Sequence, residues 1–428
     1  MITVVIPSQV AARDDCFAIA LTPLLRNPRF LTRALHAVFL YGRCEEAIAS
    51  SFASLPLGNR RVLPTPLRIG MLIINNMNIF EKIKFVLKKP SVIVVSGNGR
   101  FLAKEAIFKV LNPYFRIGKD YNPPTALPPK GRAPILIFES GDKEIRKFEF
   151  FLKNSSRAIL VITHIGDILY DEVKEVTLLA KTLPAQTNLI LNFDDETVRE
   201  INDITNLKTL TFGFGEKADL RASDVRLNMG TNFKVSYQGN IVPVWLEKLF
   251  GKEQIYSALS AVAVGIIFGL NLVEISQALK NYFSLPGKMR LIEGQRKSFI
   301  LDDSKSATVF SMVEAIEILG KIEWAKRKIA VLGDVLGIGK YTIEAPEAIG
   351  ERVAKNCDLL FTVGPRAKFI AQGAIQKGMS IEKIFQFDTI DEGKLKLREE
   401  IKEGDLILID GSREMEMEKI VKEIAAFV

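Results

Sequence analysis

The stretch Ser91–Leu111, SVIVVSGNGRFLAKEAIFKVL, decides the fold because its pattern changes twice. It begins with a β-branched run that suits a buried parallel strand. Gly97-Asn98-Gly99 follows, and Phe101–Leu111 has apolar residues at helical spacing. Strand, glycine turn and helix form the architecture of a phosphate cradle, in which backbone N–H groups at a helix N-terminus face an anion. A tight turn between a strand and a helix also needs glycines, so this segment alone leaves both interpretations open.

Further apolar runs predict more strands of the same sheet. They are Ala133–Phe138, Ala158–Thr163 and Asn188–Asn192, with a helical pattern at Asp171–Leu183 between the last two. Alternating strands and helices imply a parallel α/β sheet, in which sites gather at the carboxyl ends of the strands. The polar residues expected at those ends are Glu139, His164, Asp167, Asn192, Asp194 and Asp195. A carboxylate there can hold Mg²⁺ beside a nucleotide, or it can simply cap a helix or a turn.

The C-terminal third repeats the alternation. Strands are predicted at Phe299–Leu301, Lys328–Leu332, Leu359–Val363 and Asp405–Ile409, and a helix-rich stretch precedes them at Lys252–Phe283. We expect a second doubly wound sheet of about six strands in a Rossmann-like order. The predicted fold class is therefore α/β, with a central P-loop-type parallel-sheet ATPase domain at 71–285 and a Rossmann-like C-terminal domain at 286–428.

Residues 1–70 differ in composition, since they contain eight arginines and no lysine. Two explanations are open. The segment is either a small N-terminal domain of its own, or translated sequence upstream of a true start at Met71 or Met77. We treat it as an atypical N-terminal segment, spurious or disordered, and assign it no function.

Composition excludes several classes of protein. The three cysteines form no CxxC pair, and only two histidines are present, so a zinc site, a disulfide framework and a Ser-His-Asp hydrolase are unsupported. The formal net charge is +8, but no Lys/Arg block is interleaved with aromatics, so we expect no nucleic-acid partner. The longest apolar run, Ala258–Leu270, is too short for a membrane span and the start does not resemble a secretory signal. A cytoplasmic monomer without a membrane partner is expected.

Several segments in order resemble one known family over roughly the last 340 residues. In the middle of the chain they are the glycine-loop segment quoted above, KDYNPPTALP, ILIFESGDKEI, AILVITHIGDILYDE and LILNFDDETV. In the C-terminal third they are LIEG, ILDDSKSATVFSM, VLGDVLGIG and DGSREMEMEKIV. Their sequence and spacing are similar to those of the Mur ligase family. The C-terminal motifs look most like those of the ligases that join D-alanyl-D-alanine to a UDP-linked muramoyl tripeptide.

The resemblance implies an activity. In this family ATP phosphorylates a carboxylate to an acyl-phosphate, and an incoming amine attacks it to give an amide and ADP. ATP and Mg²⁺ would be the cofactors, and a UDP-muramoyl peptide and D-Ala-D-Ala the partners, in peptidoglycan precursor synthesis.

The resemblance also implies site residues. Candidates for binding ATP are Gly97, Asn98, Gly99, Arg100, Asn192, Asp195, Asp303 and Lys305. Glu139, the candidate Mg²⁺ ligand, and Lys181 are the catalytic candidates. Candidates for binding substrate are Asn122, Lys288, Arg290, Gly333, Asp334, Ser412 and Arg413.

This chain also departs from the family's pattern at the ATP site. Arg100 replaces a lysine, Phe101 replaces a Mg²⁺-binding Thr or Ser, and the loop is one residue short. Leu169 stands where the family has a metal-binding histidine, and Asp410 where it has a lysine. Whether the chain is an enzyme is therefore left open. The alternative is a catalytically impaired pseudoenzyme that binds nucleotide, a UDP-sugar or a protein partner.

Overall fold

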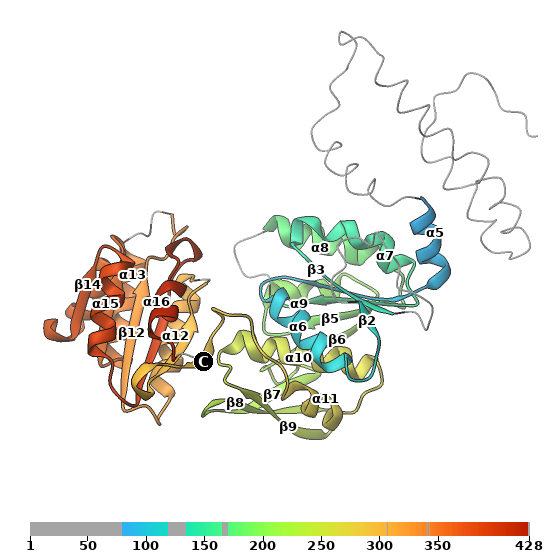
Figure 1. The fold of residues 1–428 in the computed structure, drawn as a ribbon. Helices are drawn as coiled ribbons and strands as arrows, with labels where there is room; N and C mark the ends of the chain where they lie inside the picture. Colours follow the sequence, from blue (N-terminus) through green and yellow to red (C-terminus); the bar gives the residue numbers. More distant parts are fainter. Residues whose placement is uncertain are drawn as a thin grey trace, which may run out of the picture. The chain divides into compact units, whose positions relative to one another are not determined.

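The computed structural model describes residues 79–118, 134–164, 170–305, 307–339, 341 and 343–426. The atypical segment 1–70, the substrate candidate Asn122, and Leu169 lie outside these residues. Two sheets, each covered by helices, organise the described part of the chain (Figure 1). The α/β fold class is confirmed, whereas the predicted domain boundaries stay a prediction.

The first sheet has nine strands in the order β2-β3-β1-β4-β5-β6-β7-β8-β9. Its strands are β1 (Ser91–Ser96), β2 (Ile117–Gly118), β3 (Ile135–Ser140), β4 (Arg157–Ile162), β5 (Asn188–Asn192), β6 (Lys208–Gly213), β7 (Leu220–Leu227), β8 (Gly230–Tyr237) and β9 (Asn240–Glu247). The pairings from β2 through β7 are parallel, as predicted, and the last two are antiparallel. The two predicted strands SVIVVS and NLILN have the bounds that the sequence pattern gave them.

Helices cover both faces of this sheet, and Figure 1 shows α8 and α10 on opposite sides of it. On one face lie α6 (Arg100–Leu111), α10 (Lys252–Ile267) and α11 (Leu272–Leu279). On the other lie α5 (Ile79–Lys88), α7 (Glu149–Lys153), α8 (Tyr170–Thr182) and α9 (Glu196–Asp203). Strand β1 serves both layers: Ile93 and Val95 pack with the first group, and Val92 and Val94 with the second. This alternation explains why all four central positions of the strand, Val92 to Val95, are apolar.

The antiparallel strands β7 to β9 were not predicted. Their burial alternates, with only part of each strand turned toward the core, as is usual when one face of a sheet is solvated. The alternation of strands and helices earlier in the chain gave no signal for them.

The second sheet has six strands in the order β10-β11-β15-β12-β13-β14. Its strands are β10 (Arg290–Glu293), β11 (Phe299–Asp303), β12 (Arg327–Gly333), β13 (Leu359–Val363), β14 (Ile384–Phe387) and β15 (Asp405–Asp410). Its helices are α12 (Val309–Lys321), α13 (Glu344–Asn356), α14 (Lys368–Gln376), α15 (Ile390–Glu400) and α16 (Glu418–Ile424). The first three helices pack on one face and the last two on the other, which confirms the doubly wound prediction. Only the edge strand β10 is antiparallel.

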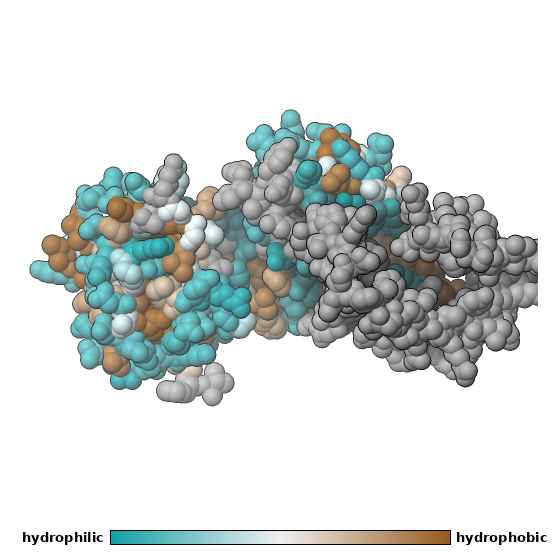
Figure 2. Space-filling model, turned by 90° about the horizontal axis from the view of Figure 1, so that it is seen from above, coloured by the Kyte–Doolittle hydropathy of each residue, from teal (hydrophilic) through white to brown (hydrophobic). Residues whose placement is uncertain are grey.

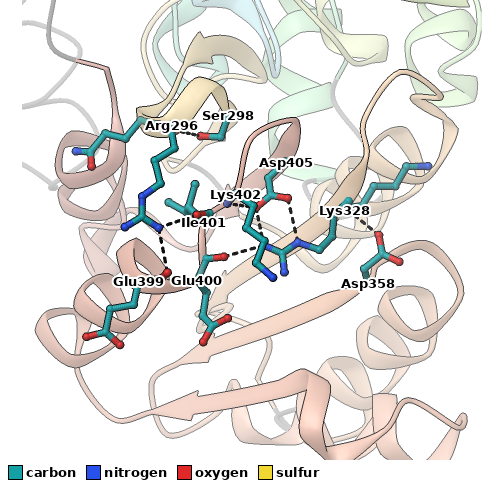
Figure 3. Close-up of polar contacts among 11 residues, drawn as sticks. Arg296, Ser298, Lys328, Asp358, Glu399, Glu400, Ile401, Lys402 and Asp405 are labelled. Atoms are coloured by element: carbon teal, nitrogen blue, oxygen red, sulfur yellow. Dashed lines mark hydrogen bonds and ion pairs between the residues drawn. The ribbon is translucent and has the colours of Figure 1, made fainter.

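Arginines fix the edge of this sheet where the parallel strands begin. Arg296, which has a left-handed backbone (φ 53°), donates to the carbonyl oxygens of Glu399 at 3.1 Å and Ile401 at 2.9 Å, at the C-terminus of α15 (Figure 3). Arg327 makes a bidentate pair with Asp405, at 2.9 and 2.7 Å, across the neighbouring strands β12 and β15. The Asp405 side chain is only 2% exposed, and Arg327 is the cation that pairs with it, while the N–H of Lys402 donates to the same carboxylate at 2.7 Å.

Arg327→Ala is therefore expected to lower the free energy of unfolding by about 2 kcal/mol, because it leaves a buried carboxylate without its cation. The matched control is Lys355→Ala, which removes an exposed pair with Glu351 and should cost at most about 0.5 kcal/mol. Urea denaturation of both variants measures the difference. Equal midpoints for the two variants would contradict the prediction.

The surface of the described residues is mostly polar on the face shown in Figure 2, with apolar residues in scattered patches. No helix within the described ranges is long and apolar enough to cross a membrane.

Candidate active site

The glycine loop connects the carboxyl end of β1 to the N-terminus of α6. Gly97 and Gly99 have φ values of 96° and 77°, a left-handed conformation that glycine adopts at little cost. The N–H of Arg100 donates to the carbonyl oxygen of Gly97 at 3.3 Å, which makes the loop a tight turn. Like every helix, α6 leaves its first N–H groups without an acceptor in the helix, and these mark its anion-binding end.

The end of β4 holds this loop in place. The N–H of Asn98 donates to the carbonyl oxygen of His164 at 2.5 Å, and the Thr163 hydroxyl donates to the carbonyl oxygen of Ser96 at 3.0 Å and to that of Asn98. A Cβ on Gly97 would lie 2.7 Å from the His164 carbonyl oxygen. The glycine at this position is therefore required by close packing as well as by its backbone angles.

Arg100 carries the loop's positive charge. Its guanidinium donates to the carbonyl oxygen of Gly97 at 3.3 Å and lies 4.8 Å from the centre of the Phe101 ring. The Phe101 side chain is 47% exposed and has no oxygen to offer a metal ion. The loop thus presents a cation and backbone donors, but no hydroxyl.

Glu139 lies near the carboxyl end of β3, beside the strand that leads into the loop. Its carboxylate is 3.5 Å from the ammonium of Lys104 on α6, and both side chains are partly exposed. Val95 of β1 is its register partner. The structure thus places the predicted carboxylate, Glu139, beside the loop, with Lys104 as its neighbour.

Asn192 ends β5, and Asp195 follows the strand at the same edge of the sheet. Asp195 caps α9 by accepting from the N–H of Val198 at 3.1 Å, and its other oxygen lies 2.8 Å from Nδ1 of His164. Asn192 is buried, and its Nδ2 has no hydrogen-bond acceptor among the residues that the structure describes. Asp195 thus has a structural task, while the amide of Asn192 has a donor to spare.

In the second sheet, two consecutive carboxylates at the end of β11 accept hydrogen bonds from the backbone on either side of Lys288. Asp302 accepts from the N–H of Gly287 at 2.8 Å, and Asp303 accepts from the N–H of Met289 at 3.3 Å. Both carboxylates are buried. Lys288 is therefore held by its two neighbours in the chain, which fixes the place of its backbone.

The loops after β12 and β15 meet at that edge. Asp334 accepts from the N–H groups of Arg366 at 3.0 Å and Ala367 at 2.7 Å, and its own carbonyl oxygen accepts from the N–H of Ser412. The Ser412 hydroxyl accepts from the N–H of Leu336 at 2.8 Å. The structure thus brings Asp334 and Ser412 together. Burial raises the pKa of the Asp334 carboxyl above its usual range.

The remaining candidates are placed as follows. The side chain of Lys305 packs so closely over Gly287 that a Cβ there would lie 2.5 Å from its Cγ. Arg290 begins the edge strand β10, next to Asp302 of β11. Gly333 ends β12, and Arg413 is exposed in the 3-10 turn after β15.

Lys181 is exposed in the last turn of α8. Because α8 runs back from the carboxyl edge of the first sheet, Lys181 lies at the opposite edge from the loop.

Asp303 and Asp410 form a buried acid pair. They are register partners on the neighbouring strands β11 and β15, and are 5% and 0% exposed. Burial raises the pKa of Asp303 to about 7, against the attraction of Lys288. Burial, followed by repulsion from Asp303, raises the pKa of Asp410 well above its usual range. Neither carboxylate oxygen of Asp410 has a hydrogen-bond partner in the described part of the chain, although the N–H of Gly411 lies near enough to oppose this rise.

This pair predicts a pH dependence of stability. The unfolded chain loses these protons near the usual pKa of Asp, about 4, while the folded chain keeps one on Asp303 until about pH 7. The free energy of unfolding contributed by Asp303 is therefore greatest below about pH 4 and falls as the pH rises through 7.

We expect Asp410→Asn to weaken that slope between about pH 4 and 7, and to stabilise the protein by about 1–2 kcal/mol at pH 8, because folding no longer has to bury this ionisable carboxyl beside Asp303. Denaturant unfolding at several pH values measures this, with the exposed Asp388→Asn as the control. A slope in Asp410→Asn equal to that of the wild type would show that the pair does not share this titration.

Comparison with known proteins gives matches to both sheets. The Mur ligase middle domain model matches residues 170–265, and the Mur ligase glutamate ligase domain model matches residues 287–413. Together the two matches span about half of the chain. The chain belongs to the Mur ligase family. The UDP-N-acetylmuramoyl-tripeptide–D-alanyl-D-alanine ligase of Bacillus subtilis (strain 168) is 25% identical over 347 residues, which are 77% of this chain and 75% of that protein.

Solved structures of the family share the fold. MurF from Acinetobacter baumannii superposes with a TM-score of 0.66 at 19% identity, covering 80% of this chain and 78% of that chain. MurF from Thermotoga maritima in complex with ADP superposes with a TM-score of 0.64 at 18% identity, covering 86% of each chain.

The residues at the loop fit a magnesium nucleotide. The N-terminus of α6 and Arg100 suit phosphate oxygens. Among the described residues no group of three His, Cys, Asp or Glu forms a metal cage. Mg²⁺ on a nucleotide does not need one, because one or two carboxylates and the phosphates are its usual ligands. Glu139, beside the loop, is the carboxylate that would hold the ion.

Two contributors to the site escaped the sequence analysis. Thr163 was seen only as the end of a strand, although its hydroxyl fixes the loop. Glu253, in the first turn of α10, lies against Gly99. Acidic residues are so common in the first turn of a helix that the sequence offered no reason to place Glu253 at the loop.

Proposed function

We propose that this Mur ligase is an active ATP-dependent ligase that joins D-alanyl-D-alanine to a UDP-linked muramoyl tripeptide. The observation that carries the proposal is the extent of the match with the Bacillus subtilis ligase of that activity, which runs through both sheets. The glycine loop at the carboxyl end of β1, with Arg100 in it and Glu139 beside it, supports the binding of ATP that this activity needs.

The role of each part follows from its position. ATP supplies the phosphoryl group that activates the carboxylate of the muramoyl peptide. The Gly97–Arg100 loop would bind its phosphates, and Glu139 the Mg²⁺ that screens their charge. The second sheet would bind the peptide and its amine through the segment of Lys288 and the loops of Asp334 and Ser412. Since an acyl-phosphate hydrolyses in water, the reactants must be enclosed during the reaction.

Arg100 keeps the positive charge of a phosphate-binding lysine but differs in shape. A planar guanidinium binds two phosphate oxygens side by side, whereas an ammonium is a compact point charge. We therefore expect nucleotide binding with altered geometry. The proposal also includes the cytoplasm as the compartment and a monomer as the active form.

The test is ADP release by the purified chain with ATP, Mg²⁺, UDP-muramoyl tripeptide and D-Ala-D-Ala, with mass spectrometry of the product. Release that requires both acceptor and dipeptide, with the mass of the joined product, supports the proposal. If the protein binds ATP but gives no product, it is a catalytically impaired member of the family, and the proposal is wrong.

A further inference from the structure

A second carboxylate, from α10, reaches the phosphate loop. Gly99 is the N-cap of α6, and a Cβ built on it would lie 3.0 Å from Oε1 and 3.1 Å from Cγ of Glu253. Glu253 stands in the first turn of α10, which packs on the same face of the sheet as α6. The carboxylate of one helix start thus lies against the start of another, where the nucleotide phosphates are expected.

Attraction to the positive end of α6 explains only part of this arrangement. A carboxylate at a helix N-terminus is stabilising, but only weakly. An unscreened carboxylate at a phosphate site, however, repels the ligand by an energy that grows as water is excluded. A negative side chain at this point is therefore compatible with tight phosphate binding only when a cation lies between the two.

The ligands on this face of the sheet suit a divalent cation. Glu139 lies on the α6 side of the sheet, as its contact with Lys104 and the packing of the alternate residues Ile135 and Ile137 show. Phosphate loops commonly complete the Mg²⁺ shell with a Ser or Thr hydroxyl, and here the residue after Arg100 is Phe101. The loop thus lacks one oxygen ligand, and Glu253 brings one from outside it.

Asn192 adds an independent sign of a ligand. Its buried Nδ2 has no acceptor among the described residues. By strand alternation, its side chain is on the same face as Ile190, which packs with α6 and α10. A buried amide donor at this edge suits an oxygen of a ligand that the protein alone does not provide.

We infer that Glu253 is a ligand, direct or through water, of the divalent cation that accompanies nucleotide phosphates at the Gly97–Arg100 loop. The inference rests on the proposed binding of ATP, and it assigns this chain a metal ligand that comes from α10. Nucleotide binding should then depend strongly on the metal, because without it two carboxylates face the phosphates.

The experiment is calorimetric titration of ATP, with Mg²⁺ and without any metal, into the wild type and Glu253→Gln. Glu274→Gln, a first-turn glutamate of α11, is the matched control. We expect Glu253→Gln to bind ATP about tenfold more weakly than the wild type in Mg²⁺, and no more weakly without metal. Electron paramagnetic resonance of Mn²⁺ with ATP should show a weaker ternary complex in the same variant, and thermal unfolding checks that it is folded.

The possible failures are distinguishable. If Glu253→Gln binds ATP in Mg²⁺ at least as tightly as the wild type does, the carboxylate of Glu253 does not hold the metal ion. The inference is then wrong. If the wild type binds no ATP at millimolar concentration with or without metal, the proposed nucleotide site fails together with the inference.

Discussion

Replacing Gly97 by alanine is expected to weaken ATP binding by about 100-fold, because displacing the loop by even about 1 Å misplaces every donor that faces the phosphates. The new Cβ would lie 2.7 Å from the His164 carbonyl oxygen and 2.7 Å from Oγ1 of Thr163. The backbone at φ 96° is also unfavourable for alanine. The loop must move away from β4, which breaks the hydrogen bond from Asn98 to His164.

Alanine variants at two other glycines distinguish the effect of steric crowding from that of a strained backbone. Gly239, in the turn between β8 and β9, has φ 79° and nothing within 4 Å of its Cβ position. Gly239→Ala should cost only about 1–2 kcal/mol of stability, for the left-handed backbone, and leave ATP binding unchanged. Gly99→Ala meets only the flexible end of Glu253 and should fall between the two. Calorimetry with Mg²⁺ and ATP ranks the three variants, and wild-type affinity in Gly97→Ala would show that the loop does not bind phosphate.

The sequence predicted the parts of this fold whose signal is local. The runs SVIVVS and LLFTV are mostly apolar on both faces because each strand is covered by helices on both sides, and such runs have clear ends. Glycines with polar neighbours after a strand also marked the loop. These features depend on residues that are close in the chain, so a single sequence carries them.

What the sequence could not give depends on contacts between distant segments. Glu253 reaches Gly99 from more than one hundred and fifty residues away, only because α10 returns to pack beside α6. Asp410 follows the predicted strand Asp405–Ile409, at a position where the family has a lysine, whereas β15 extends to include it and buries it beside Asp303. Lys181 matched the family by position in the chain, but the direction of α8 takes it to the far edge of the sheet. The strand register and the direction of each helix decide where these side chains lie, and both depend on how all the strands of the sheet pair.

Glu139→Gln is expected to reduce ligase turnover by about 100- to 1000-fold, because it removes a charge that would hold Mg²⁺ while negative charge develops on the transferred phosphoryl group. Glutamine keeps the shape of the side chain, so stability should change little. Glu293→Gln is the matched control, since Glu293 forms a similar exposed pair with Lys248 at 3.4 Å. ADP release under saturating ATP and Mg²⁺ measures the effect.

Lys104 decides between two explanations of that loss. Lys104 lies 3.5 Å from Glu139, so the carboxylate could act merely as the partner that orients this lysine. In that case Lys104→Ala would cost as much turnover as Glu139→Gln, and the double variant would cost no more. If Glu139 holds the metal, raising the Mg²⁺ concentration should recover part of the activity of Glu139→Gln and none of the activity lost in Lys104→Ala. Full turnover in Glu139→Gln would refute both roles, because neither a metal ligand nor a partner for Lys104 can lose its charge without a cost to the reaction.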